Sequence, residues 1–202
     1  RSHDPARFEQ RVRYHLAADL YRRDMLDLRN PLLTAADPSA VVEDRIRELV
    51  ERAFEPLPRQ FDQYYLEVTL DDVRACCPIS VTAEDLAQTR NRDAIFQAVL
   101  DDALRAYRRR QSEFGDILQD VARRVLVNVI DRCWRDHLAR SEALPASLGL
   151  MDDPTGDRTG DPTAAYEEAL ASSYLLMTDE IIRESVGFMF HLDPADLERD
   201  SD

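Results

Sequence analysis

A row of apolar residues spaced four apart constrains the fold of this chain more than any other feature. A second apolar row runs beside it, and the two rows are Ile117, Val121, Val125, Val129, Cys133 and His137, and Leu118, Ala122, Leu126, Ile130, Trp134 and Leu138. The spacing predicts one broad apolar face on a helix of about 28 residues, roughly 40 Å long, which Pro145 is expected to end. Because only five glycines occur among 202 residues, a turn-rich β fold is disfavoured. The sequence therefore predicts an all-α fold.

Prolines and capping residues divide the first part of the chain into helices. An amphipathic helix is expected over residues 5–29, behind an Asp4-Pro5 cap, and Asn30-Pro31 should end or kink it. A second helix is expected from Asp37-Pro38 to Phe54. Residues 61–79 show a less regular pattern and are expected to form short helical turns.

The later helices are marked by the same signals. Thr82, with Asp85 three positions on, predicts a capping box at the start of a helix, and another helix should cover residues 92–110. Pro162 should restart a helix behind an Asp161 cap. The turn-forming acidic stretch at 152–161 would then join two long helices into a hairpin, and residues 56–90 resemble a small inserted subdomain.

Charge and residue usage exclude several classes of function. A formal net charge of −14 disfavours nucleic-acid binding and loose adhesion to anionic lipid. Every one of the 26 cationic residues is an arginine, so the sequence has no phosphate-binding P-loop lysine and no Schiff-base lysine. No apolar run approaches the roughly 18 residues that would suggest a membrane span. The chain is therefore not expected to be an enzyme, to cross a membrane or to carry a cofactor.

The sequence disfavours metal and catalytic sites. Cys133 and His137 are four apart on one helix face, and with Cys76 and Cys77 they could be imagined as zinc ligands. Adjacent cysteines suit a tetrahedral site poorly, and free cysteine usually behaves as a small buried hydrophobe in a reducing compartment. We expect no metal, and we expect Trp134 and His137 to be packed core residues.

Other polar pairs are also expected to be structural. Carboxylate pairs such as Asp71-Asp72 and Asp101-Asp102 should lie on a solvated surface, since helix neighbours face different directions. The adjacent serines at 172 and 173 have no histidine partner within sequence reach. The sequence therefore predicts no catalytic residue.

Several segments resemble the SecA preprotein translocase family, in the order in which that family has them. The most specific of them is a signature in predicted α-helical sequence: an apolar residue is followed by Asp, then by Trp, and then by an acidic residue with His-Leu. In this chain the signature residues are Ile130, Asp131, Trp134, Asp136, His137 and Leu138. Two further stretches, at 78–86 and 184–192, are similar to the family's proline-apolar-Ser-Val-Thr motif and to the end of its last scaffold helix.

The resemblance implies an elongated helical scaffold with a small inserted helical wing domain and a two-helix finger. It places the long scaffold helix region in 1–55, the wing-like domain in 56–110 and the finger and return helix in 111–192. The acidic composition of residues 193–202 separately predicts a disordered tail. The implied role is to couple an ATPase, absent from this chain, to a preprotein or the SecY channel. The implied partners are SecA-type motor domains, in the cytoplasm or peripherally at the inner face of a bacterial membrane.

The region that would form the finger tip departs from the family pattern. Leu148, Leu150 and Met151 lie where the tip is expected, but the family's flanking arginines and tip aromatic are missing. Five acidic residues and one arginine between 142 and 161 give this stretch a net charge of −4. An alternative role, as a stand-alone SecA-derived adaptor for another protein, therefore stays open.

A cluster of arginines provides the second candidate for partner contact. Arg105, Arg108, Arg109 and Arg110 form the strongest basic patch in the sequence. It could be a solvated helix end, or it could contact an acidic surface, for which the planar guanidinium is well suited. These arginines and Leu148, Leu150 and Met151 are the predicted partner-contact residues.

Overall fold

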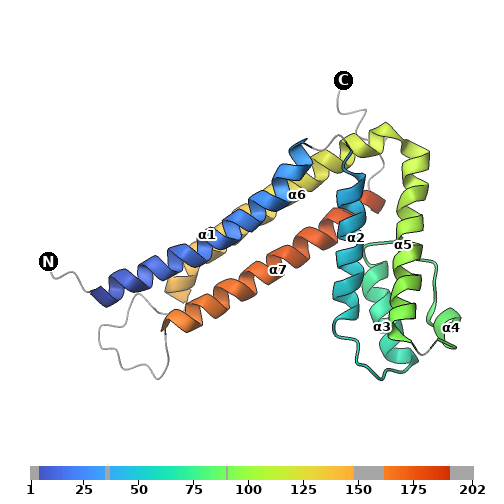
Figure 1. Cartoon of the computed structure of the whole chain (residues 1–202), viewed down its shortest axis with the longest axis horizontal. Helices are drawn as coiled ribbons and strands as arrows, with labels where there is room; N and C mark the ends of the chain where they lie inside the picture. Colours follow the sequence, from blue (N-terminus) through green and yellow to red (C-terminus); the bar gives the residue numbers. More distant parts are fainter. Residues whose placement is uncertain (1–4, 35–36, 90, 148–161, 192–202) are drawn as a thin grey trace. The chain divides into compact units, whose positions relative to one another are not determined.

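A computed structural model describes residues 5–34, 37–89, 91–147 and 162–191, and within them every regular element is an α-helix. The all-α prediction is therefore confirmed. The described residues form seven helices, and their arrangement within each part of the chain can be followed in Figure 1. Their bounds are α1 Pro5–Thr34, α2 Ser39–Phe54, α3 Gln63–Arg74, α4 Ala83–Leu86, α5 Arg92–Phe114, α6 Asp116–Ser147 and α7 Pro162–His191. The Asp4 and Asp161 caps, the acidic stretch 152–161 and the tail 193–202 lie outside the described residues.

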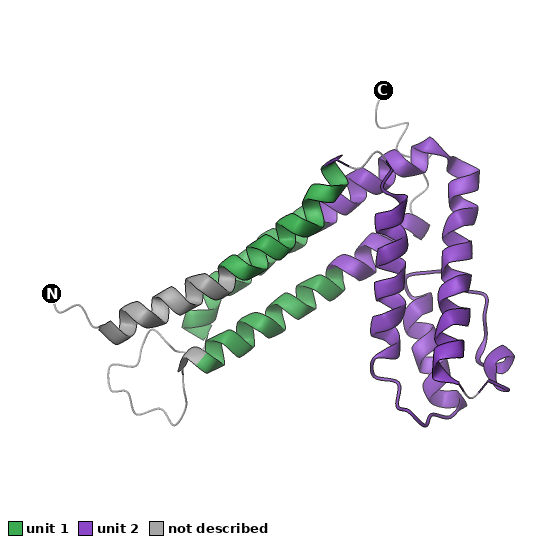
Figure 2. Cartoon of the chain, viewed as in Figure 1, with its two compact units in different colours: residues 1–33, 130–180 green, residues 34–129, 181–202 purple. Residues whose placement is uncertain are grey.

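The chain divides into two compact units (Figure 2). Unit 1 takes in residues 1–33 and 130–180, and unit 2 takes in residues 34–129 and 181–202. Both α6 and α7 contribute residues to each unit, because the unit boundaries fall inside these two helices.

Unit 1 is built from α1 and from parts of α6 and α7. Its buried side chains come from all three helices and include Met25, Leu32, Ile130, Cys133, Leu170 and Met177. Asn30-Pro31 was expected to end or kink α1; the helix does not end there, since it continues to Thr34. Leu32, on the next position, is 0% exposed, and burying such a side chain contributes about 1.5–3 kcal/mol. That gain is of the same size as the cost of a proline inside a helix, about 3 kcal/mol.

Unit 2 is a small helical domain around α2 and α5. Helix α2 packs against α5 and α3, and α4 packs against α3. Its core is apolar, with fully buried Ile46, Leu49, Leu70, Ile95, Leu100 and Tyr107. Burial and nearby acidic groups raise the pKa of Tyr107 to about 12. The residue therefore stays neutral and acts as a core aromatic.

Residues 61–79 contain one regular helix, not the short turns expected from sequence. Helix α3 begins after Asp62, whose side chain accepts a hydrogen bond from the Tyr65 amide. Leu66, Leu70 and Val73 recur at helical spacing and are buried. The exposed aromatic residues of this stretch obscured that pattern in the sequence.

Other helix ends differ slightly from expectation. The Thr82–Asp85 capping box is present, as predicted, but it opens a helix of only four residues. Helix α5 continues four residues past 110 to Phe114 and is capped by Gly115, whose φ of 53° favours glycine. Helix α6 passes Pro145 and ends at Ser147, so this proline lies within the last turn.

Candidate functional site

The signature residues lie on α6 in unit 1, and they range from buried to exposed around the helix. Ile130 and His137 are buried, Trp134 and Leu138 are half-buried, and Asp136 is exposed. Asp136 makes an ion pair with Arg132 at 3.6 Å, and Arg132 also reaches Glu180 on α7 at 3.3 Å. The signature is therefore a packing motif with polar residues along its edge.

Asp131 joins α6 to α1. The Arg29 guanidinium donates to both oxygens of its carboxylate, from Nε to Oδ1 at 2.7 Å and from Nη2 to Oδ2 at 3.0 Å. This two-point geometry fixes the orientation of both side chains. The hydrogen bond and the charge of Asp131 raise the pKa of Arg29. Arg29 and Asp131 are 102 positions apart in the sequence, so helix periodicity could not identify them as partners.

His137 is held between two serine hydroxyls and is 2% exposed. Its Nδ1 lies 3.1 Å from Ser173 Oγ on α7, and its Nε2 lies 3.4 Å from Ser141 Oγ. Ser141 donates its hydroxyl proton to the His137 carbonyl oxygen at 2.7 Å, so it can only accept from the imidazole. We therefore assign the proton to Nε2, which leaves Nδ1 to accept from Ser173.

Burial lowers the pKa of His137, and the positive charge of Arg140 lowers it further. The imidazole is therefore neutral at physiological pH. Its ring nitrogens face Ser173 and Ser141 and not a carboxylate, unlike the arrangement that activates a serine nucleophile. The contact with Ser173 was missed in the sequence, because the two residues are 36 positions apart.

Aromatic rings complete the surroundings of His137. Tyr21 of α1 stacks on Tyr174 of α7, with ring centroids 4.1 Å apart and an interplanar angle of 18°. Trp134 lies 5.4 Å from the imidazole, and Tyr21 and Tyr174 meet it edge-on. The Tyr174 hydroxyl donates to Asp24 at 3.4 Å. Burial and Asp24 raise the pKa of Tyr174 to about 12, so this donor remains protonated.

The predicted arginine cluster on α5 is more heterogeneous than the sequence suggested. Arg105 donates to Asp102 at 3.1 Å, and Arg108 makes a two-point contact with Glu43 at 3.0 and 3.2 Å. The Arg110 guanidinium lies 5.0 Å over the Phe114 ring. Arg109 is exposed and makes no ion pair within the described part of the chain. Leu148, Leu150 and Met151 lie outside the described residues.

Asp102 corrects one expectation about the carboxylate pairs. It is 3% exposed, whereas a solvated position was expected. Its carboxylate accepts from the amides of Ser80 at 2.5 Å and Val81 at 2.9 Å, and from the Ser80 hydroxyl. Burial raises the pKa of Asp102, but the hydrogen bonds from Val81, Ser80 and Arg105 lower it by more. Asp102 thus fixes the Ser-Val-Thr stretch that resembled the family motif.

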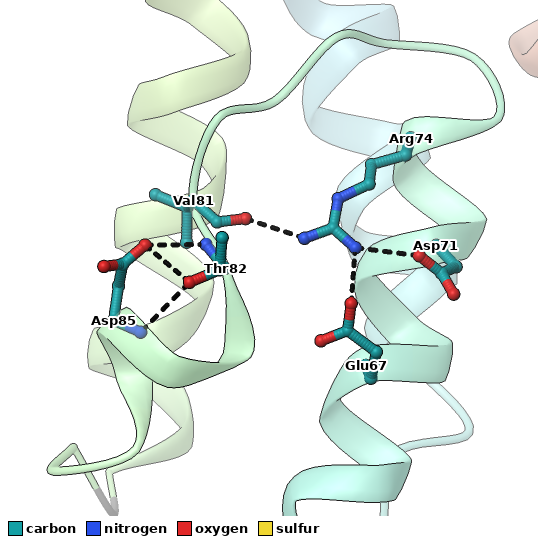
Figure 3. Close-up of polar contacts among 6 residues, drawn as sticks. All are labelled: Glu67, Asp71, Arg74, Val81, Thr82 and Asp85. Carbon is teal, nitrogen blue, oxygen red and sulfur yellow. Dashed lines mark hydrogen bonds and ion pairs between the residues drawn. The ribbon is translucent and has the colours of Figure 1, made fainter.

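Arg74 also holds this stretch, through the Val81 carbonyl oxygen (Figure 3). Its Nη1 donates to Glu67 at 2.7 Å and Asp71 at 2.8 Å, and its Nη2 donates to the Val81 carbonyl oxygen at 2.9 Å. Thr82 and Asp85 close the capping box beside it. Arg74 therefore links α3 to the segment that leads into α4. No pattern in the sequence predicts this contact.

Asp72 is a further exception to the solvated surface expected for such pairs. The Arg183 guanidinium of α7 donates to both of its oxygens at 2.9 Å, which ties α3 to α7 within unit 2.

Among the described residues, no three His, Cys, Asp or Glu side chains converge on a point where they could hold a metal ion. None of the described helices has an apolar stretch long enough to cross a membrane.

The comparisons with known proteins all point to one family. The SecA wing and scaffold domain family matches residues 9–193. The chain is 28% identical over 161 residues to the protein translocase subunit SecA of Tropheryma whipplei (strain Twist), covering 75% of this chain and 18% of that protein. For the protein translocase subunit SecA of Cutibacterium acnes the identity is 28% over 171 residues, covering 82% of this chain and 18% of that protein.

A third relative is the protein translocase subunit SecA 1 of Mycobacterium tuberculosis (strain ATCC 25177 / H37Ra). It is 29% identical over 144 residues, covering 65% of this chain and 15% of that protein. The chain thus spans less than a fifth of the length of these curated relatives. Because the family match covers most of the sequence and both the signature helix and the Ser-Val-Thr stretch lie within it, the chain belongs to the SecA wing and scaffold domain family.

Proposed function

We propose that this chain is the non-catalytic scaffold and wing portion of a SecA-like translocation motor. It would transmit conformational change between an ATPase, which this sequence does not contain, and a preprotein or the SecY channel. The observation that carries the proposal is the family match over residues 9–193, supported by relatives that are each a protein translocase subunit SecA. The site of action would be the cytoplasm, at the inner face of a bacterial membrane.

The internal geometry of unit 1 supports a mechanical role. Each pair of its three helices is joined by a specific contact: α1 to α6 by Arg29 and Asp131, α1 to α7 by the stacked tyrosines, and α6 to α7 by His137 and Ser173. Directional contacts of this kind resist the sliding of one helix along another. Nonspecific apolar packing by itself resists such sliding less strongly. A displacement imposed on one helix would therefore be passed to the other two.

The assignment of parts follows from the same proposal. Residues 1–55 would belong to the long scaffold helix region, 56–110 to the wing, and 111–192 to the finger and return helix. Leu148, Leu150 and Met151 would be partner-contact residues. Arg109 is the member of the arginine cluster best placed to meet an acidic partner, since Arg105 and Arg108 already pair within the chain.

The test is a quantitative pull-down of the tagged chain from native cytosol and membranes, read by mass spectrometry. Recovery of SecA-type motor domains, SecY or preproteins is expected. Arg109→Glu should lower that recovery several-fold, because it places a carboxylate against an acidic surface. Arg47→Glu is the matched control, an exposed arginine on α2 without an ion pair among the described residues, and it should leave recovery unchanged.

The second candidate function is a stand-alone adaptor that retains the SecA scaffold. The observation that favours it is the acidic stretch between 142 and 161, with a net charge of −4 where the family's flanking arginines would be expected. Recovery of one unrelated protein, without any Sec component, would contradict the translocase role and support the adaptor.

A further inference from the structure

Two adjoining hollows lie between α3 and α4 in unit 2, each about 580 Å³ in volume. They share Gln63 and Ala83 as lining residues, so together they form one groove along the side of α4. We call it the α3–α4 groove. None of the roles described above for the chain uses it.

The first hollow can accept an apolar side chain. Phe61, Leu66 and Leu86 line it together with Ala83 and Ala87. Leu66 and Leu86 are 3% and 7% exposed, so they give the hollow an ordered floor, while Phe61 is half-buried and Ala87 is exposed. Gln60, Gln63 and Thr89 also line this hollow. The charged residues at this hollow are Arg59 and Asp62, one of each sign. An aliphatic side chain placed here would leave water for a preformed apolar surface.

The second hollow is suited to a cation. Tyr64 lines it with 72% of its surface exposed, and Glu67 and Glu84 lie on the same wall. Glu67 is already paired with Arg74, whereas Glu84 makes no ion pair within the described residues. An aromatic face beside a free carboxylate is the combination that attracts a guanidinium or ammonium group.

The walls of the groove are already ordered. Arg74 fastens α3 to the Val81 carbonyl oxygen, and the capping box of Thr82 and Asp85 fixes the start of α4 (Figure 3). A ligand would therefore bind without ordering a loop, which lowers the entropy cost of association.

We propose that the α3–α4 groove binds a segment of another protein chain that carries an arginine or lysine next to an aliphatic residue. The aliphatic side chain would fill the hollow over Leu66 and Leu86, and the cation would lie against Tyr64 and Glu84. Charge complementarity favours this occupant, since the second hollow holds two carboxylates and no cation other than the engaged Arg74 beside it. The inference goes beyond the translocase role and does not depend on it.

The test is fluorescence polarisation with the full chain and a fluorescein-labelled nine-residue peptide, in which a Leu-Arg-Leu core is flanked by Gly and Ser. Binding with a Kd of roughly 10–100 μM is expected for so small a contact. Replacing the central arginine with Glu, or both leucines with Gly, should weaken binding at least about tenfold.

Variants of the groove locate the binding site. Glu84→Gln and Tyr64→Ala should each raise Kd about five- to tenfold, since each removes one element of the cation subsite. Ala87→Trp, at an exposed lining position, should block the apolar hollow without removing a core side chain. The controls are Glu113→Gln and Val68→Ala, an exposed acid on α5 and an exposed apolar residue on α3, neither of which lines the groove.

Circular dichroism melts of each variant distinguish a folding defect from a binding defect. The proposal is overturned if the peptide does not bind by about 1 mM, or if the three groove variants leave Kd unchanged. It is also overturned if sedimentation shows a dimer that Ala87→Trp dissociates, because the groove would then belong to a second copy of this chain.

Discussion

The buried carboxylate of Asp102 accepts a hydrogen bond from the Ser80 amide at 2.5 Å and another from the Val81 amide, and so fastens residues 80–81 to the middle of α5. Because this carboxylate also accepts from the Ser80 hydroxyl, removing its charge leaves several donors poorly satisfied. Asp102→Asn should lower the free energy of unfolding by about 1–3 kcal/mol, measured by urea denaturation. Asp101→Asn, at the exposed neighbouring position, should change it by less than about 0.5 kcal/mol. Equal effects of the two substitutions would contradict the role assigned to Asp102.

Ser173 should stabilise unit 1 through His137. Ser173→Ala removes the hydroxyl that donates to Nδ1 and leaves that nitrogen without its partner. We expect a loss of about 0.5–1.5 kcal/mol in the free energy of unfolding. Ser172→Ala changes the exposed serine beside it and should have little effect. The nitrogen-15 chemical shifts of the His137 ring would report the expected proton on Nε2, and a proton on Nδ1 would refute the assignment.

The stability of the chain should fall between pH 7.5 and pH 5. The pKa of His137 is lowered by burial from its ordinary value of 6.5, so the unfolded chain takes up this proton at a higher pH than the folded chain. The contribution of His137 is therefore fully present above pH 6.5 and is lost as the pH falls toward the lowered pKa. Asp102, whose pKa is lowered from 3.8, adds a further loss only in more acidic solution.

Urea denaturation at several pH values checks this expectation. His137→Gln should reduce the change in stability between pH 7.5 and pH 5, although it lowers stability at every pH. His191→Gln is the control, since His191 is exposed at the end of α7. An unchanged pH dependence in His137→Gln would show that another group causes it.

Two glycines should respond in opposite directions to alanine. Gly115 has a φ of 53° and a ψ of −130°, a conformation that strains any residue with a Cβ. Gly115→Ala should therefore destabilise the chain by about 1–3 kcal/mol. Gly187 lies inside α7, where an added Cβ would meet nothing within 4 Å. Gly187→Ala should raise stability by about 0.5–1 kcal/mol, because alanine loses less backbone entropy on helix formation. Thermal melts of both variants measure these changes, and a shift of the same sign in both would contradict the argument.

The sequence by itself determined the helical class, the family resemblance and most helix positions. These follow from interactions between residues three or four apart, such as the apolar rows of α6 and the Thr82–Asp85 capping box, and short-range signals can be read along a chain. Sequence reasoning failed at α3, where exposed Tyr64 and Tyr65 obscured the buried spacing, and at Pro31, where burial of Leu32 offsets the cost of proline.

Only the tertiary structure decided which polar residues meet. Asp102 and Ser80 are 22 positions apart, His137 and Ser173 are 36 apart, and Arg29 and Asp131 are 102 apart. No local propensity specifies such pairs, since they form only when packed helices bring distant positions within hydrogen-bond reach. The same packing buried Asp102 and paired Arg105 and Arg108, because desolvation and proximity depend on the neighbours of a side chain in space and not in sequence.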